Sequence, residues 1–188
     1  MKYIALLRGI NVGGNHKVDM KKLKTLFASL GFDNVSTYIN SGNVMFEGSG
    51  PPQEISQKLE LRFRKEFNFD IPTLVKTEKE LVDVVKAIPK SWKNDAAERT
   101  DVAFLFPEFD SIKIIDNLPV KREFVDIRYV KGAVYWHVKR ENIYKSQLSK
   151  LISHNLYKHM TIRNIRTARA LVIIAQKLDT SARNYEAD

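Results

Sequence analysis

Three glycines follow the first apolar stretch of the chain, in the segment Arg8-Gly9-Ile10-Asn11-Val12-Gly13-Gly14-Asn15. Glycine lets backbone amides approach a ligand closely and tolerates a positive φ. A loop of this kind between a strand and the start of a helix could hold a phosphate or a carboxylate. Its spacing matches neither the dinucleotide-binding fingerprint nor the P-loop, so spacing alone favours an ordinary crossover loop.

A second polar turn, Asn40-Ser41-Gly42-Asn43, separates two predicted strands. In a split βαβ unit the first two strands run parallel, and the third lies between them and antiparallel to both. The exit of the first strand and this turn must then lie at the same end of the sheet. The polar residues expected to gather there are Arg8, Asn11 and Asn15 with Asn40, Ser41 and Asn43. Asn, Ser and Gly also occur at turns for conformational reasons alone.

Three arginines recur at three-residue steps near the C-terminus, with Asn164 beside the first of them. They are Arg163, Arg166 and Arg169. If a helix begins near Arg163, the three lie on a slowly drifting stripe beside its apolar face. Guanidinium groups bind phosphates and carboxylates through paired hydrogen bonds. A solvated helix face, with aliphatic stems covering the core, explains the pattern equally well.

The sequence has no recognisable catalytic or metal-binding pattern. His154 and His159 do not share a helix face, no H-E-x-x-H or G-x-S-x-G segment occurs, and there is no cysteine. We therefore predict no metal site and no cofactor. A ferredoxin-like sheet that reads RNA needs exposed aromatics on its central strands, where only Tyr3 and Phe46 stand. Sequence-specific readout by that mode is not expected.

Hydrophobic periodicity predicts the elements that position the two N-terminal loops. Strands are expected at residues 3–7, 35–39, 44–47 and 72–76. One helix starts after Asp19 and stops at Gly31, and a second buries Ile55, Leu59, Phe63 and Phe67. The order β-α-β-β-α-β predicts an α+β fold whose N-terminal half is a ferredoxin-like split βαβ unit.

The second half of the chain has a related pattern. Thr77 to Glu80 matches a capping box for a helix that Pro89 ends. Strands are expected at 101–106, 123–130 and 133–139, and helices at 111–117, 147–153 and 167–177. This β-α-β-β-α-α order echoes the first half and suggests a structural duplication. The predicted domains are residues 1–76, ferredoxin-like, and residues 77–188, a smaller α+β half with a basic C-terminal helix, packed together.

Composition limits the class of protein. The 188 residues are 44% hydrophobic, and the net charge of +9 comes from the two ends. Residues 1–50 hold six basic and three acidic groups, and residues 139–188 hold ten and four. Such a balance attracts anionic partners or simply solubilises the surface. The absence of cysteine, and of any apolar run near the roughly 20 residues that span a bilayer, predicts a soluble cytoplasmic protein that does not insert into membranes.

Several segments together resemble a bacterial family known as domain of unknown function 1697. They are Ala5 to Gly14, then Met20 and Leu23, Gly31-Phe32, Val35 and Thr37 to Val44, with a looser match at Thr161, Arg163-Asn164 and Thr167. The resemblance spans nearly the whole chain and implies a two-part α+β fold. It implies no established activity and therefore assigns no catalytic residue.

The sequence thus predicts a binding protein for an anionic ligand, with catalytic residues unknown. The ligand classes are a phosphometabolite, a nucleotide or a nucleic-acid backbone. The predicted ligand-binding residues are Arg8, Gly9, Asn11, Gly13, Gly14, Asn40, Ser41, Asn43, Arg163, Asn164 and Arg166. An enzyme that uses a bound metal or substrate assistance, and a structural or protein-interaction module, remain alternatives. The sequence leaves the oligomeric state open.

Overall fold

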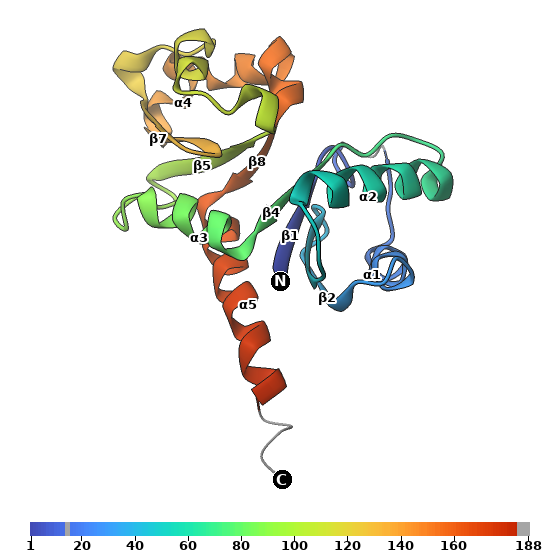
Figure 1. The fold of residues 1–188 in the computed structure, drawn as a ribbon. Coiled ribbons are helices and arrows are strands. Elements are labelled where there is room, and N and C mark those ends of the chain that lie inside the picture. The colour runs from blue at the N-terminus through green and yellow to red at the C-terminus, as the bar shows by residue number, and fades with distance from the viewer. Residues whose placement is uncertain (14–15, 184–188) are drawn as a thin grey trace. The chain divides into compact units, whose positions relative to one another are not determined.

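Five consecutive apolar residues form most of β1 (Lys2–Leu7), an inner strand of the first of two four-stranded sheets. The computed structural model describes residues 1–13 and 16–183, and for 178–183 the backbone alone. The sheet order is β2-β3-β1-β4, and all neighbouring strands are antiparallel. The predicted β-α-β-β-α-β order and split βαβ arrangement are therefore confirmed (Figure 1). The elements that follow β1 are α1 (Met20–Ser29), β2 (Asp33–Tyr38), β3 (Asn43–Glu47), α2 (Pro52–Phe67), β4 (Thr73–Thr77) and α3 (Glu78–Ala87).

Local signals set several of these boundaries as the sequence predicts. The carboxylate of Asp19 accepts hydrogen bonds from the first-turn amides of α1, and Gly31 ends that helix at φ 83°. Before α3, the hydroxyl of Thr77 accepts from the Glu80 amide at 3.2 Å. The Glu80 carboxylate in turn accepts from the Thr77 amide at 2.8 Å, which completes the predicted capping box.

The chain divides into two compact units. Unit 1 comprises Met1–Leu81 with Leu171–Asp188, and unit 2 comprises Val82–Ala170. The domain boundary expected between residues 76 and 77 stays a prediction. In unit 1, α1 and α2 cover one face of the sheet and bury an aromatic cluster against it (Figure 1). Phe27 contacts Phe46 edge-on at 5.1 Å between ring centroids, and Phe63 lies 6.0 Å from Phe27.

Unit 2 contains the second sheet, whose order is β6-β7-β5-β8. Short helical segments cover one face of it and contribute Ile114, Leu148 and Leu151 to its core (Figure 1). The strands are β5 (Glu98–Leu105), β6 (Asp126–Val130), β7 (Ala133–Lys139) and β8 (Met160–Asn164). The α-helical elements are α4 (Ile143–Ser146) and α5 (Ile165–Arg183), of which α5 continues into unit 1 from Leu171, and the 3-10 turns include 112–117, 148–153 and 155–159.

The two sheets have the same topology, with β5 to β8 in the places of β1 to β4. Even individual hydrogen bonds recur. The Leu7 amide donates to Gly42 O at 2.8 Å, and Leu105 donates to Gly132 O at 3.0 Å. In each sheet the following amide donates to the residue just before the last strand: Arg8 donates to Pro72 O, and Phe106 donates to His159 O. This correspondence supports the hypothesis of a structural duplication.

One strand of unit 2 departs from the sequence prediction. Met160–Asn164 is β8, paired antiparallel with β5, whereas we expected no strand there. Consequently α5 begins at Ile165, and Arg163 lies on β8 and not on the helix. β8 is short and pairs with residues some 60 positions earlier (Asp101 with Asn164), so local periodicity does not reveal it. The helices expected at 111–117 and 147–153 are 3-10 turns.

Candidate functional site

Asn11 fastens the strand-one loop to its two neighbours in unit 1. Its Nδ2 donates to Asn40 O at 2.9 Å and to Val18 O at 3.0 Å, and its Oδ1 accepts from the Val18 amide at 2.8 Å. Its φ of 54° lies in the left-handed region that Asn tolerates. The predicted proximity of the strand-one loop and the Asn40 turn is therefore confirmed.

Gly42 allows the tip of the β2–β3 hairpin to pack closely against the end of β1. Its φ is 73°, and an added Cβ would lie 2.7 Å from Leu7 Cβ and 3.0 Å from Ile10 Cδ1. Asn43 is fully buried beside it and donates to Tyr38 O and Ser41 Oγ, each at 3.0 Å. Asn43 thus shapes the turn from within and does not face solvent, while Ser41 is half-buried.

The glycines of the strand-one loop are needed for backbone conformation. Gly9 and Gly13 have φ of 75° and 64°, both are exposed, and an added Cβ would meet no atom within 4 Å at either position. Gly14 and Asn15 lie outside the described residues. Arg8 is half-buried at the end of β1, where its amide donates to Pro72 O at 2.9 Å.

A hollow of about 810 Å³ opens beside this joined pair of loops. We call it the rim hollow, and the residues that line it are Asn11, Lys17, Val18, Asp19, Met20, Lys21 and Asn40. Lys17, Lys21 and Asn40 are exposed. Sequence reasoning found Asn11 and Asn40 but missed both lysines, because a lysine near a helix start resembles any solvated residue.

The start of α1 borders the rim hollow but does not offer its first amides to an anion. Asp19 Oδ1 already accepts from the amides of Lys21 and Lys22, at 2.7 and 3.0 Å. The hydrogen bonds from Lys22 and Lys21 lower the pKa of the Asp19 carboxyl. The expected cradle of helix amides is therefore occupied by the protein's own carboxylate, and lysine ammonium groups supply the positive charge.

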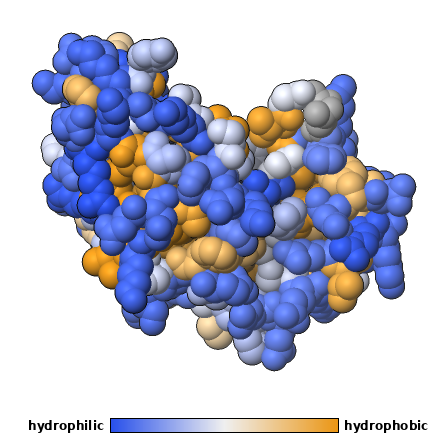
Figure 2. Space-filling view, turned by 90° about the horizontal axis from the view of Figure 1, so that it is seen from above, coloured by the Kyte–Doolittle hydropathy of each residue, from blue (hydrophilic) through white to orange (hydrophobic). Residues whose placement is uncertain are grey.

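Two apolar side chains stand next to the residues that join the loops. Val12 follows Asn11 and is 65% exposed, and Ile39 precedes Asn40 and is 51% exposed. Ile39 has a φ of 51°, which is an outlier for a β-branched residue and costs of the order of 1–3 kcal/mol. On the face drawn in Figure 2, apolar groups interrupt a mainly hydrophilic surface in several places.

The C-terminal residues of the predicted site lie in unit 2 and do not form one helical stripe. Arg163 is on β8, 9% exposed, and its Nη1 donates to Thr161 Oγ1 and to Ile162 O, each at 2.9 Å. Burial lowers the pKa of its guanidinium to about 10. Asn164 caps α5 by accepting from the Thr167 amide at 2.9 Å, and Arg166 is exposed. That these residues share a site with the N-terminal loops stays a prediction.

At the corresponding end of the second sheet, side chains bond directly to the tip of the β6–β7 hairpin. Asp110 takes the place of Asn11, because its Oδ1 accepts from the amide of Gly132 at 2.7 Å and from the hydroxyl of Tyr129 at 2.9 Å. Burial, together with the bond to Asp110, raises the pKa of Tyr129. Phe109 and His159 stack at 3.5 Å between ring centroids over the adjacent chain entry.

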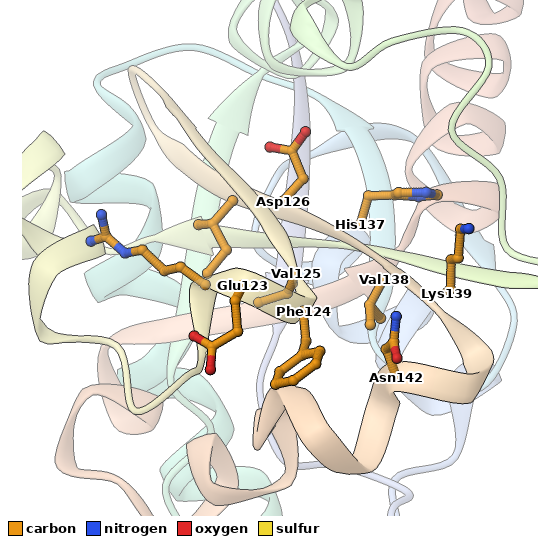
Figure 3. Close-up of a pocket in the computed structure, with 10 residues that line it drawn as sticks. Glu123, Phe124, Val125, Asp126, His137, Val138, Lys139 and Asn142 are labelled. Carbon is orange, nitrogen blue, oxygen red and sulfur yellow. The ribbon is translucent and has the colours of Figure 1, made fainter.

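A second hollow, of about 570 Å³, lies in unit 2 between β6, β7 and the turn before β6. Its charged side chains diverge: Asp126 points away from Glu123, and His137 and Lys139 point to a different side from Phe124 (Figure 3). We therefore regard it as a weaker candidate than the rim hollow. Within the described parts of the chain there is no cluster of three or more metal-ligating His, Asp or Glu residues. No helix among those residues is long and apolar enough to span a membrane.

Comparison with known proteins places the chain in a family. No curated protein matches it. A solved structure, that of the conserved bacterial protein SP0830 from Streptococcus pneumoniae, superposes with a TM-score of 0.80 at 28% sequence identity. That match covers 93% of this chain and 98% of the other. The model of the family described as protein of unknown function (DUF1697) matches residues 1–136, and the chain belongs to this family.

Proposed function

We propose that the protein binds a small anionic ligand, a phosphate ester with an organic portion, in the rim hollow. The observation that carries the proposal is that Lys17, Lys21 and Asn40 border one hollow of about 810 Å³. A hollow of this size suits a small organic molecule. Two ammonium groups at its edge would attract a phosphate and bind it as point charges.

The hydrogen bonds of Asn11 support a site whose parts keep their positions. Asn11 joins the loop, the start of α1 and the hairpin tip, so that Lys21 and Asn40 are held on connected segments. A binding group that is already positioned loses less conformational entropy when the ligand arrives. The exposed Val12 and Ile39 beside it would contact an apolar portion of the ligand, which favours a nucleotide or a similar ester over free phosphate.

The matching topology of the two sheets allows an internal comparison that favours unit 1. Asp110 and Asn11 fasten equivalent hairpin tips, but Asp110 carries a negative charge and Asn11 does not. A carboxylate that bonds to the hairpin tip disfavours anions, whereas a neutral amide does not repel them. The Asp19 carboxylate also lines the rim hollow, but the two ammonium groups of Lys17 and Lys21 outnumber it and leave the lining positive. A cytoplasmic location is part of the same proposal, and phosphate esters are abundant there.

Thermal unfolding in the presence of a panel of compounds tests the proposal. We expect one nucleoside phosphate or sugar phosphate to raise the Tm saturably, with about 2.7 kcal/mol of stabilisation at a hundredfold excess over Kd. The double variant Lys17→Ala/Lys21→Ala should lose this effect. Lys65→Ala/Lys79→Ala removes two exposed lysines from α2 and α3 in unit 1, neither of which lines the rim hollow, and should retain it. A ligand that stabilises both double variants equally, or a panel without any saturable stabilisation, would refute the proposal.

A further inference from the structure

Positive charge is concentrated in one segment of unit 2, residues 139–159, which we call the basic layer. It contains five lysines and arginines (Lys139, Arg140, Lys145, Lys150 and Lys158) and a single acidic residue, Glu141. It comprises α4 and the 3-10 turns on either side of it. None of these residues lines the rim hollow, so the basic layer is a separate surface.

The basic layer has an apolar inner side and a charged outer side. Leu148 and Leu151 are buried in the core of unit 2, and Ile143, Leu156 and Tyr157 pack against that core. Lys145, Lys150 and Lys158 are exposed. The apolar residues anchor the layer to the sheet, so its exposed ammonium groups can face a partner. The Lys145 ammonium also lies 5.8 Å from the ring centroid of Phe124.

Two features of the outer side indicate the chemistry of that partner. Tyr144 is 92% exposed, next to Lys145, and Ile152 is 68% exposed. Arg140 donates to Asp95 O and to Asn94 Oδ1, two neutral oxygens that fix the guanidinium without neutralising its charge. An exposed aromatic ring that precedes a lysine, on a segment rich in cations, suits a polyanion that carries flat, stackable groups.

We propose that the basic layer binds single-stranded nucleic acid, with Lys145, Lys150 and Lys158 near phosphates and Tyr144 stacked on a base. Duplex recognition is disfavoured because α4 has four residues, too few to enter a groove as a recognition helix. Insertion into a membrane surface is disfavoured because the layer has no long helix with a continuous apolar face. Unlike an RNA-reading sheet, this mode does not use Tyr3 and Phe46, both of which are fully buried.

Fluorescence anisotropy with a labelled single strand of about 15 nucleotides tests this proposal with the full chain. Three phosphate contacts predict that log K falls with log salt at a slope of about −2. Lys145→Glu/Lys150→Glu should weaken binding by about tenfold or more at moderate salt. Tyr144→Ala should weaken it by about 5- to 150-fold, and Tyr144→Phe, which retains the ring, should restore it.

The matched control is Lys24→Glu/Lys65→Glu, which makes the same change in charge at exposed sites in unit 1. It should retain most of the affinity. The proposal is overturned if this control loses as much affinity as Lys145→Glu/Lys150→Glu, or if a duplex of the same sequence binds as tightly as the single strand. It is also overturned if the strand does not bind while vesicles containing anionic phosphatidylglycerol do.

Discussion

Replacing Asn11 by alanine tests the geometry on which the rim hollow depends. The substitution removes two hydrogen bonds donated to Asn40 O and Val18 O, one accepted from the Val18 amide, and a long one donated to Met20 Sδ at 3.8 Å. At a partly exposed position these contribute about 2 kcal/mol together. Alanine at a φ of 54° costs about 1 kcal/mol more, because asparagine tolerates the left-handed region and alanine does not. The expected loss in the free energy of unfolding is therefore about 3 kcal/mol.

Urea denaturation followed by fluorescence measures this loss, and Asn68→Ala separates its two causes. Asn68 is exposed at the C-terminal end of α2 with a φ of 61°, so its replacement should cost about 1 kcal/mol for conformation alone. The difference between the two variants then reports the hydrogen bonds of the Asn11 side chain. If both variants lose the same free energy to within about 0.5 kcal/mol, Asn11 does not join the loops as described.

Three further predictions follow from single contacts. Gly42→Ala should lower the free energy of unfolding by about 3 kcal/mol, because the added Cβ would lie 2.7 Å from Leu7 Cβ. Gly9→Ala, which has a similar φ and open space around it, should lower the free energy of unfolding by only about 1 kcal/mol. Equal losses in urea denaturation would contradict the close packing at Gly42. Thr77→Ala breaks the capping box and should lower the free energy of unfolding by about 1 kcal/mol, and Thr77→Ser should restore most of it; no change in the first variant would contradict the cap. Burial raises the pKa of Asp101 above 3.8, although Arg99 Nε binds its carboxylate at 2.6 Å. The contribution of Asp101 to the stability of the fold is therefore complete below pH 3.8 and is lost as the pH rises through the raised pKa. Asp101→Asn should remove this decline when stability is measured across that range, and an unchanged pH profile would contradict the prediction.

Unit 1 could be predicted from sequence because its signals are local. Asp19, Gly31 and the Thr77–Glu80 box mark helix ends through contacts within a few residues, and the apolar spacing marks the strands between them. The proximity of Asn11 and Asn40 followed from topology alone, since the split βαβ order allows one placement of the two loops.

Unit 2 was harder to predict from sequence, because the contacts that determine its structure join residues far apart in the chain. β8 exists through pairing with β5, and that pairing buries Arg163, which local spacing had placed on a helix face. Lys17 and Lys21 were missed for a different reason. Their side chains make a site only together with the hollow that they border, and residue type alone does not distinguish such lysines from other surface lysines.

Titration of the ¹⁵N-labelled protein with the best-stabilising phosphate ester, followed by ¹H–¹⁵N correlation spectra, tests the central claim most directly. The proposed function predicts saturable shifts of the amide signals of Asn11, Lys17, Lys21 and Asn40, the residues that line the rim hollow. The signals of Gly132 and Tyr129, at the equivalent end of the second sheet, should stay in place. Shifts confined to unit 2, or none at the four rim residues on saturation, would contradict a ligand site in the rim hollow.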